Sequence, residues 1–350
     1  MTDFEKKKEE EVKASAKKVK EPKVKKEKIK KTKTPMSKEK FMKMLMGSKD
    51  DMGLLKKIAV YVILISVGFI FLYPILQMVA TSFMSYDDLM NSSITWIASD
   101  YSFENYRVTM AKMDYFNALL DSVALAGLST LCQIVVCSLV GYGLARYNFK
   151  GRTVIMLIII ISFIIPSQVL EIPIFVVYSQ MGLTGTLLAF IIPALFVQGF
   201  KAQLFILICW SFFRQIPQVL NEAASIDGAG HIKQYFKIAI PSAKGALVVV
   251  ALFSFVWYWN EDYLTTLYLY QSGSARGEIT PLINKLQLFE TDFSSAAISS
   301  SYGAQQTGVT INQSYSMCAT VLCILPLLIL YIILQKQFVE SIDRAGITGE

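Results

Sequence analysis

The residues that could carry out chemistry are few in this chain, and the sequence does not bring them together. Glu261 and Asp262 are neighbouring carboxylates, a residue type that can serve as general acid or base. No nucleophile accompanies them in a known motif, and the chain has one histidine, His231. We therefore expect the two carboxylates to form a polar cap at a helix end, and we predict no catalytic residues. An enzyme that uses these carboxylates is the alternative.

Metal and nucleotide sites are not indicated either. The five cysteines form no C-x-x-C pair, and a single histidine cannot complete a zinc site with them. Each cysteine lies in or beside an apolar run, which favours a small buried side chain. The phosphate-binding pattern G-x-x-x-x-G-K-[ST] does not occur in the sequence. We predict no metal and no cofactor on this chain, and we expect it not to hydrolyse ATP itself.

The positive charge is concentrated at one end of the chain. Residues 1–57 contain 20 Lys and 10 Asp or Glu, whereas the remaining 293 residues carry 14 Lys or Arg and 17 acidic residues. Few apolar residues are available for burial in 1–57, which is typical of a disordered segment. We predict a Lys-rich cytoplasmic tail that is solvated or attracted to anionic lipid headgroups. Aromatic residues are not interleaved with the basic ones, so we expect no nucleic-acid partner.

The rest of the chain, residues 58–350, is dominated by long apolar runs. Of all residues, 53% are hydrophobic and 17% are charged, whereas soluble domains carry about 25% charged residues. About 20 apolar residues in a helix cross the hydrocarbon core of a membrane, and a helix satisfies its own backbone groups there. We predict an all-α polytopic membrane protein with six transmembrane helices, at residues 58–83, 119–145, 153–178, 184–213, 238–259 and 315–334.

Basic residues in the connecting segments indicate the orientation, because cytoplasmic loops are enriched in Lys and Arg. Residues 84–118 hold two basic residues against five acidic ones, as expected outside the cell. The segment after the fourth predicted span holds Arg214, Lys233 and Lys237. We predict a multi-pass plasma-membrane protein with both the N-terminus and the C-terminus in the cytoplasm.

A polar segment between the fourth and fifth predicted spans has the pattern of a helical hairpin. Pro217 suits the first turn of a short helix over 217–226, and Gly228 suits the left-handed residue that ends it. A second helical pattern begins near His231. We predict a helix, a glycine turn and a helix on the cytoplasmic side, shaped to dock into a groove of a partner. The alternative is an amphipathic hairpin that rests at the lipid headgroups.

This hairpin and several other stretches resemble a known family. The stretch "EAASIDGAGHIKQYFKIAIP" (222–241) is similar to the cytoplasmic signature of ABC importer permeases. The stretches "GYGLARYNFKG" (141–151), "IIPSQVLEIPIF" (164–175) and "LQKQFVESIDRAGITGE" (334–350) resemble the carbohydrate importers of the maltose-permease type. The resemblance covers about 58–350 and leaves the basic tail outside it.

The resemblance implies a fold, a set of partners and a set of coupling residues. The fold is the ABC importer type I permease fold, in which a cytoplasmic coupling loop, here about 214–237, docks on the ATP-hydrolysing subunit. The partners are a second permease subunit, two ATP-binding subunits that hold ATP and Mg, and an extracellular solute-binding protein that delivers a carbohydrate. The residues that match the coupling signature are Glu222, Ala223, Ala224, Asp227, Gly228 and Pro241.

Polar residues within the spans indicate where a solute would cross. Glu171 lies between Pro166 and Pro173, and it departs from the apolar or hydroxyl residue that the family has there. An ionisable group at membrane depth usually faces a cavity or a partner, so we predict that Gln168 and Glu171 face the translocation path or the partner permease. Asn260, at the end of the fifth predicted span, is a further candidate for the path. The alternative for Glu171 is a hydrated position at the outer interface. For the solute, an amino acid or a peptide is the alternative to a carbohydrate.

Overall fold

The computed structural model describes residues 47–48, 51–270, 279–301 and 313–347. Most of the predicted Lys-rich tail lies outside these residues. The chain divides into two compact units, Met1–Ile70 and Phe71–Glu350, and every predicted site residue lies in the second. Apart from one antiparallel pair, β1 (Gly47–Ser48) and β2 (Asp51–Met52), the described elements are helical.

The helices are joined mostly by short connections. In chain order they are α3 (Leu54–Ser82), α4 (Tyr86–Met90), α5 (Glu104–Lys112), α6 (Tyr115–Arg146), α7 (Arg152–Ile164), α8 (Gln168–Gln180), α9 (Leu188–Leu195), α10 (Ala202–Gln215), α11 (Gln218–Ile226), α12 (His231–Gln234), the π-helix η1 (Tyr235–Ala239), α13 (Ile240–Ser242), α14 (Lys244–Trp259), α15 (Tyr263–Leu269), α16 (Leu282–Ser301) and α17 (Gln313–Ile347).

Three helices are long and apolar enough to cross a membrane by themselves, namely α3, α6 and residues Gln313–Gln337 of α17. They match the first, second and sixth predicted spans. Three further helix pairs meet the same criteria only together, and each pair is bent. The bend is 101° between α7 and α8, 70° between α10 and α11, and 77° between His231–Ser242 and α14. By length and composition, the described residues contain three spans, or up to six if each bent pair counts as one.

Three of the predicted spans are each broken into more than one helix, although the number of spans reaches the predicted six if each bent pair counts as one. The third, 153–178, covers α7 and α8, because Pro166 has no N–H to continue the helix. The residue before it, Ile165, is extended, with φ −66° and ψ 125°, as the residue before a proline prefers. The fourth, 184–213, covers α9 and α10, which are separated by the irregular residues 196–201. The fifth, 238–259, covers the end of η1, α13 and α14.

Helix α6 is the centre of the second unit. It packs against α9, α10 and α14, and apolar side chains of these helices contribute to two buried clusters. Gly141 of α6 permits the close approach of α10, since a Cβ atom there would lie 2.7 Å from Cβ of Cys209 and 3.0 Å from the backbone N of Trp210. A small residue at such a contact lets two helix backbones approach each other in a membrane.

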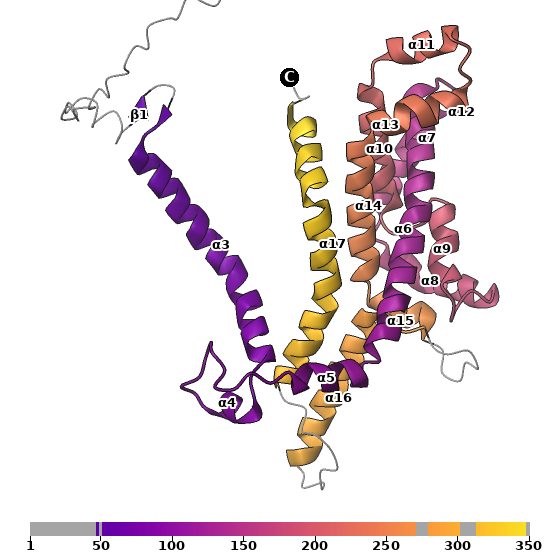
Figure 1. The fold of residues 1–350 in the computed structure, drawn as a ribbon. Coiled ribbons are helices and arrows are strands. Elements are labelled where there is room, and N and C mark those ends of the chain that lie inside the picture. The colour runs from indigo at the N-terminus through magenta and orange to yellow at the C-terminus, as the bar shows by residue number, and fades with distance from the viewer. Residues whose placement is uncertain (1–46, 49–50, 271–278, 302–312, 348–350) are drawn as a thin grey trace, which may run out of the picture. The chain divides into compact units, whose positions relative to one another are not determined.

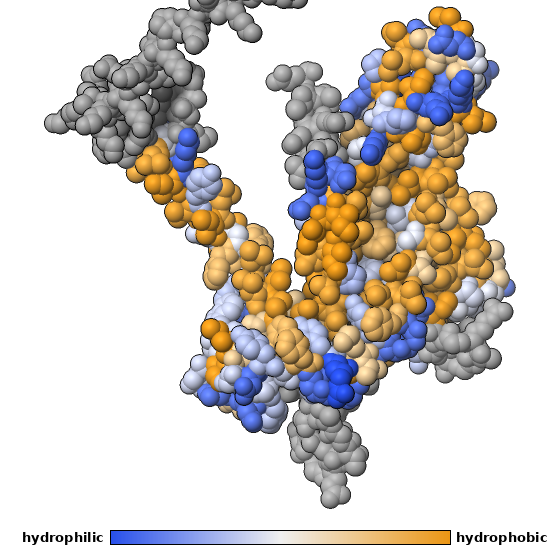
Figure 2. Space-filling view, in the orientation of Figure 1, coloured by the Kyte–Doolittle hydropathy of each residue, from blue (hydrophilic) through white to orange (hydrophobic). Residues whose placement is uncertain are grey.

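The two ends of the second unit differ in character (Figure 1). Helices α11 and α12 form a hairpin at one end, and α17 runs toward that end, whereas α5, α15 and α16 lie at the opposite end. Apolar residues cover the sides of the helices between the two ends, and polar residues gather at the ends (Figure 2). This distribution is typical of helices that cross a membrane, with the hairpin outside the apolar zone.

The contact at Gly141 leads to a stability prediction. We expect Gly141→Ala to lower the free energy of unfolding by about 1–3 kcal/mol, because the added methyl overlaps the backbone of α10. Gly143→Ala, two residues further along the same helix with no atom within 4 Å of the added methyl, is the matched control. It should leave stability unchanged or raise it by up to about 1 kcal/mol. Thermal unfolding of both variants in detergent measures the difference, and equal midpoints would contradict the packing argument.

Candidate functional site

The hairpin is shaped by one proline and one glycine. Ile216, which precedes Pro217, is extended with φ −68° and ψ 126°, so α10 ends there and α11 starts in a new direction. Gly228 has a φ of +76°, a conformation that glycine adopts without steric cost. Both positions confirm the predicted helix, turn and helix. Pro241 lies at the other end of the segment, in α13, directly after the π-helix η1.

A buried amide holds the two helices of the hairpin together. Nε2 of Gln234 donates to Oγ of Ser225 at 2.9 Å and to the carbonyl oxygen of Ala229 at 2.8 Å. Ser225 in turn donates to the carbonyl oxygen of Asn221 at 2.9 Å. Gln234 is 5% exposed, and burying a side-chain amide is favourable only when it is hydrogen-bonded. The hairpin therefore has a fixed shape of its own, and Gln234 is a site residue that the sequence did not single out.

Aromatic side chains join the base of the hairpin to α6. The hydroxyl of Tyr235 lies 2.7 Å from Oγ of Ser138, and its ring lies 5.1 Å from the ring of Tyr142. The ring of His231 lies edge-on to Tyr147, with 5.3 Å between the centroids. The single histidine, for which the sequence indicated no role, thus packs against the end of α6. These contacts fix the base of the hairpin to the end of α6.

Arg146 adds a polar contact at the same place. Its Nη2 donates to the carbonyl oxygen of Ile216 at 2.6 Å, the group that the break before Pro217 leaves without a helical partner. Arg146 is half-buried, and a hydrogen bond from a charged donor is stronger than one between neutral groups. The end of α10 and the start of the hairpin are therefore tied to the end of α6 by a hydrogen bond as well as by aromatic packing.

The outer face of the hairpin is exposed and apolar. Ile226 and Ile232 are 86% and 76% exposed, and Val219, Leu220 and Phe236 are exposed with them. No residue of α11 is buried. The predicted coupling residues lie around this face, with Glu222, Ala223, Asp227, Gly228 and Pro241 exposed and Ala224 half-buried. An exposed apolar surface with charged residues at its edge is typical of an interaction site.

A pocket of about 450 Å³ lies where the two broken spans meet. Its lining includes the break between α7 and α8 and the break between α9 and α10. From the hairpin end, α7 and α10 run 13 and 14 residues to reach these breaks, which is about 20 Å at the rise of an α-helix. The hydrocarbon core of a bilayer is about 30 Å thick. The pocket therefore lies at membrane depth.

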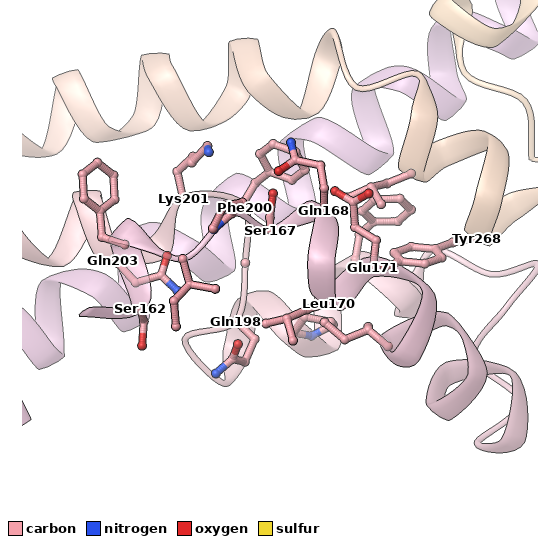
Figure 3. Close-up of a pocket in the computed structure, with 18 of the residues that line it drawn as sticks. Ser162, Ser167, Gln168, Leu170, Glu171, Gln198, Phe200, Lys201, Gln203 and Tyr268 are labelled. Atoms are coloured by element: carbon pink, nitrogen blue, oxygen red, sulfur yellow. The ribbon is translucent and has the colours of Figure 1, made fainter. Parts of the chain in front are cut away.

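The lining of the pocket is mixed. Aromatic rings come from Phe163, Tyr178, Phe190, Phe200, Tyr258 and Tyr268, and polar groups from Ser162, Ser167, Gln168, Glu171, Gln198, Lys201 and Gln203. In Figure 3 the polar ends of Gln168, Glu171 and Lys201 point to one side, and those of Ser162 and Gln198 to the other. Neither Glu171 nor Lys201 forms an ion pair with another residue that the structure describes.

Two of the three predicted path residues lie in this pocket. Gln168 and Glu171 line it, whereas Asn260 does not and is the exposed residue that ends α14. Lys201 lines the pocket too, although the sequence did not lead us to predict it as a path residue. Its position inside the predicted span 184–213 was the available signal, because a charged residue at membrane depth indicates a functional site.

The two neighbouring carboxylates have structural roles. An oxygen of Glu261 accepts a hydrogen bond from the N–H of Leu264 at 2.8 Å, in the first turn of α15, and a carboxylate oxygen of Asp262 accepts one from Gln287. Burial raises the pKa of the Glu261 carboxyl, and the negative charges of Asp262 and Glu171 add to this effect. Within the described residues, no group of three or more His, Cys, Asp or Glu side chains could hold a metal ion.

Comparison with known proteins relates both sites to a family. The sequence pattern of the binding-protein-dependent transport system inner membrane component matches residues 137–344. The chain is 27% identical to the polygalacturonan/rhamnogalacturonan transport system permease protein YtcP of Bacillus subtilis, over 83% of this chain and 97% of that protein. It is 29% identical to the trehalose/maltose transport system permease protein MalG of Thermococcus litoralis, over 85% of this chain and 98% of that protein.

A solved structure has the same fold. It is the crystal structure of a bacterial ABC transporter involved in the import of the acidic polysaccharide alginate, and one of its chains superimposes with a TM-score of 0.66 and 21% identity. The similarity covers 83% of this chain and 98% of that one. The matched family region includes the whole hairpin and every residue that lines the pocket. The chain belongs to the family of binding-protein-dependent transport system inner membrane components, the permeases of ABC importers, in which ATP is hydrolysed by separate subunits.

Proposed function

We propose that this chain is the permease subunit through which an ABC importer moves a carbohydrate, most simply an oligosaccharide, across the plasma membrane. The family match over 137–344 is the observation that carries the proposal. The choice of a carbohydrate is supported by relatives whose names specify polygalacturonan, rhamnogalacturonan, trehalose and maltose. An extracellular solute-binding protein delivers the solute, and a second permease subunit completes the path.

In this proposal the hairpin is the part of the chain that contacts the ATP-binding subunits. Two ATP-binding subunits, which hold ATP and Mg, lie in the cytoplasm, where the hairpin and both chain termini also lie. The apolar face around Ile226 and Ile232 enters a groove on one of these subunits, and Glu222 and Asp227 contact polar groups at its edge. The Lys-rich tail stays in the cytoplasm, near the anionic lipid headgroups.

Movement passes from the hairpin into the membrane through α6. When the ATP-binding subunits change their separation, they pull or push the hairpin, and the contacts of Tyr235 with Ser138 and Tyr142 transfer that displacement to α6. ATP binding can favour one permease state only if the ATP-binding subunits contact the two states with different free energies. The fixed shape of the hairpin makes such a difference possible, because a flexible loop would absorb the movement.

The pocket lined by Gln168 and Glu171 is the proposed part of the translocation path. Its aromatic rings can pack against the apolar faces of sugar rings, and its amides, hydroxyls and carboxylate can bind sugar hydroxyls. Asn260 is not included, because it lies outside the pocket.

One observation favours a second class of solute. Lys201 and Glu171 give the pocket one positive and one negative group, which would also suit the carboxylate and the ammonium group of an amino acid or a peptide. The carbohydrate proposal is preferred because the named relatives above transport carbohydrates.

The docking role of the hairpin can be tested with a charge reversal. We expect Glu222→Arg to reduce solute-stimulated ATP hydrolysis by the assembled importer about tenfold or more, because reversing one charge of an interfacial contact costs about 2–5 kcal/mol. Co-purification of the ATP-binding subunits measures assembly in parallel. Asp100 is an exposed acidic residue remote from the hairpin. The control variant Asp100→Arg should therefore keep both the assembly and the solute-stimulated ATP hydrolysis. Intact assembly and intact coupling in Glu222→Arg would remove the docking assignment.

The path can be tested with a pair of leucine substitutions. We expect Glu171→Leu to lower uptake about tenfold at low solute concentration, since a hydrogen bond to a charged group contributes about 1.5–3 kcal/mol. Asn260→Leu should leave uptake unchanged, because Asn260 lies outside the pocket. Uptake into cells, corrected for the amount of importer, is the measurement. An unchanged rate in Glu171→Leu would exclude Glu171 from the path.

The solute class can be tested with the complete importer in proteoliposomes. We expect at least one oligosaccharide from a panel of neutral and uronic-acid-containing sugars to stimulate ATP hydrolysis in the presence of the solute-binding protein. Dipeptides and free amino acids should give no stimulation. Stimulation by a dipeptide alone would favour the second class of solute and would leave the permease assignment intact.

A further inference from the structure

The break between α9 and α10 has an unusual backbone. Two residues of this segment that are not glycine have positive φ angles, Val197 at 66° and Lys201 at 52°. A left-handed conformation is costly for a β-branched residue such as valine, and it persists only where the surroundings enforce it. We call residues 196–201 the break loop. This loop lies at the same membrane depth as the pocket. Irregular backbone at that depth must be satisfied by the protein itself or by water in a cavity.

Side chains of α6 and α14 satisfy the break loop at Phe200. Nε2 of Gln133 donates to the carbonyl oxygen of Phe200 at 2.5 Å, and the N–H of Phe200 donates to the hydroxyl oxygen of Tyr258 at 3.1 Å. Gln133 is itself held, because its Oε1 accepts a hydrogen bond from Ser254 at 3.3 Å. Gln133 is 0% exposed and Tyr258 2% exposed. Both backbone groups of Phe200 therefore bind buried side chains that come from other helices.

Gly199 makes this arrangement possible. A Cβ atom at position 199 would lie 2.8 Å from the hydroxyl oxygen of Tyr258 and 2.9 Å from Oε1 of Gln133. The loop backbone thus lies directly against the two side chains that bind it. A continuous helix through 184–213 would need none of these contacts, since its backbone groups would bind one another. Instead, buried polar side chains stabilise an interruption of the helix at residues 196–201.

The break loop forms a wall of the pocket. Gln198, Gly199, Phe200 and Lys201 all line the pocket, and the polar end of Lys201 points to the same side as those of Gln168 and Glu171 (Figure 3). In a continuous helix these residues would be distributed around the helix axis, at 3.6 residues per turn. The direction of Lys201 therefore depends on the break loop, and the break loop depends on its buried contacts.

We propose that Gln133, Ser254 and Tyr258 form a clamp that holds the break loop open and so positions Lys201 in the wall of the solute pocket. They are positioning residues for solute recognition: Gln133 and Ser254 act through the loop, and Tyr258 holds Phe200 from the pocket side. The identification of the pocket as the solute path rests on the proposed function, whereas the clamp itself does not. Loss of the clamp changes the pocket wall and leaves the hairpin, more than ten residues further along the chain, in place.

Cysteine accessibility tests the clamp without any solute. One variant carries Lys201→Cys on the break loop, and another carries Gln168→Cys on α8. Both also carry Cys132→Ala, because Cys132 is partly exposed whereas the other four native cysteines are buried. The rate of reaction with a water-soluble maleimide is measured on the purified protein. We expect Gln133→Leu to change the rate at position 201 by about fivefold, the effect of losing roughly one hydrogen bond, and to leave the rate at position 168 unchanged.

Two further variants make the result decisive. Ser129→Ala is the matched control, since Ser129 lies one turn before Gln133 on α6, is equally buried, and its hydroxyl has no hydrogen-bond partner among the described residues. It should change neither rate. Tyr258→Phe keeps the ring but removes the acceptor for Phe200, and it should act in the same direction as Gln133→Leu. If Gln133→Leu and Tyr258→Phe leave the rate at 201 unchanged, or change the rates at 201 and 168 equally, the clamp has no positioning role.

Transport by the assembled importer gives the second readout. We expect Tyr258→Phe and Gln133→Leu to raise the KM for solute about fivefold, in line with the loss of one positioned contact, and to leave kcat for ATP hydrolysis close to that of the wild type. An effect on kcat alone would overturn the positioning role. Should no sugar be transported, the accessibility result still decides the clamp, so its failure and the failure of the proposed function are distinguishable.

Discussion

Every backbone N–H and C=O group at membrane depth must find a partner within the protein or in a water-filled cavity, and the rest of this structure depends on that constraint. Regular helices meet it by themselves, which accounts for the uninterrupted α3, α6 and α17. The pocket and the hairpin both lie where a helix stops. Pro166 breaks one span at the pocket, residues 196–201 break a second beside it, and Pro217 turns the chain into the hairpin.

At each of the two sites, a buried glutamine donates a hydrogen bond to a backbone carbonyl of an irregular segment. Gln133 donates to the carbonyl oxygen of Phe200 in the pocket wall, and Gln234 donates to the carbonyl oxygen of Ala229 in the hairpin turn. An amide side chain suits this role because it donates to a free carbonyl while its own oxygen remains available for a second partner. In each case one side chain gives an irregular loop a fixed shape.

Helix α6 connects the two sites physically. Gln133 contacts the pocket wall, and Ser138, Tyr142 and Tyr147 contact the base of the hairpin. From Gln133 to Tyr147 the chain advances 14 residues, about 21 Å along a helix. A rigid helix with contacts at both places can transmit a displacement over that distance without a chain of intermediate loops. The close packing of α10 on Gly141 supports the same stretch of α6.

The sequence by itself determined the features that depend on neighbouring residues. Long apolar runs predicted α3, α6 and α17, and Pro217 and Gly228 predicted the hairpin, because proline, glycine and apolar length act locally. Only the tertiary structure decided the break loop, the place of Lys201 in the pocket lining, the partners of Gln133 and Gln234, the contact of His231 with Tyr147 and the exclusion of Asn260 from the pocket. Most of these depend on residues far apart in the chain, such as Gln133 and Phe200, and no local pattern records which distant backbone group a buried side chain will bind.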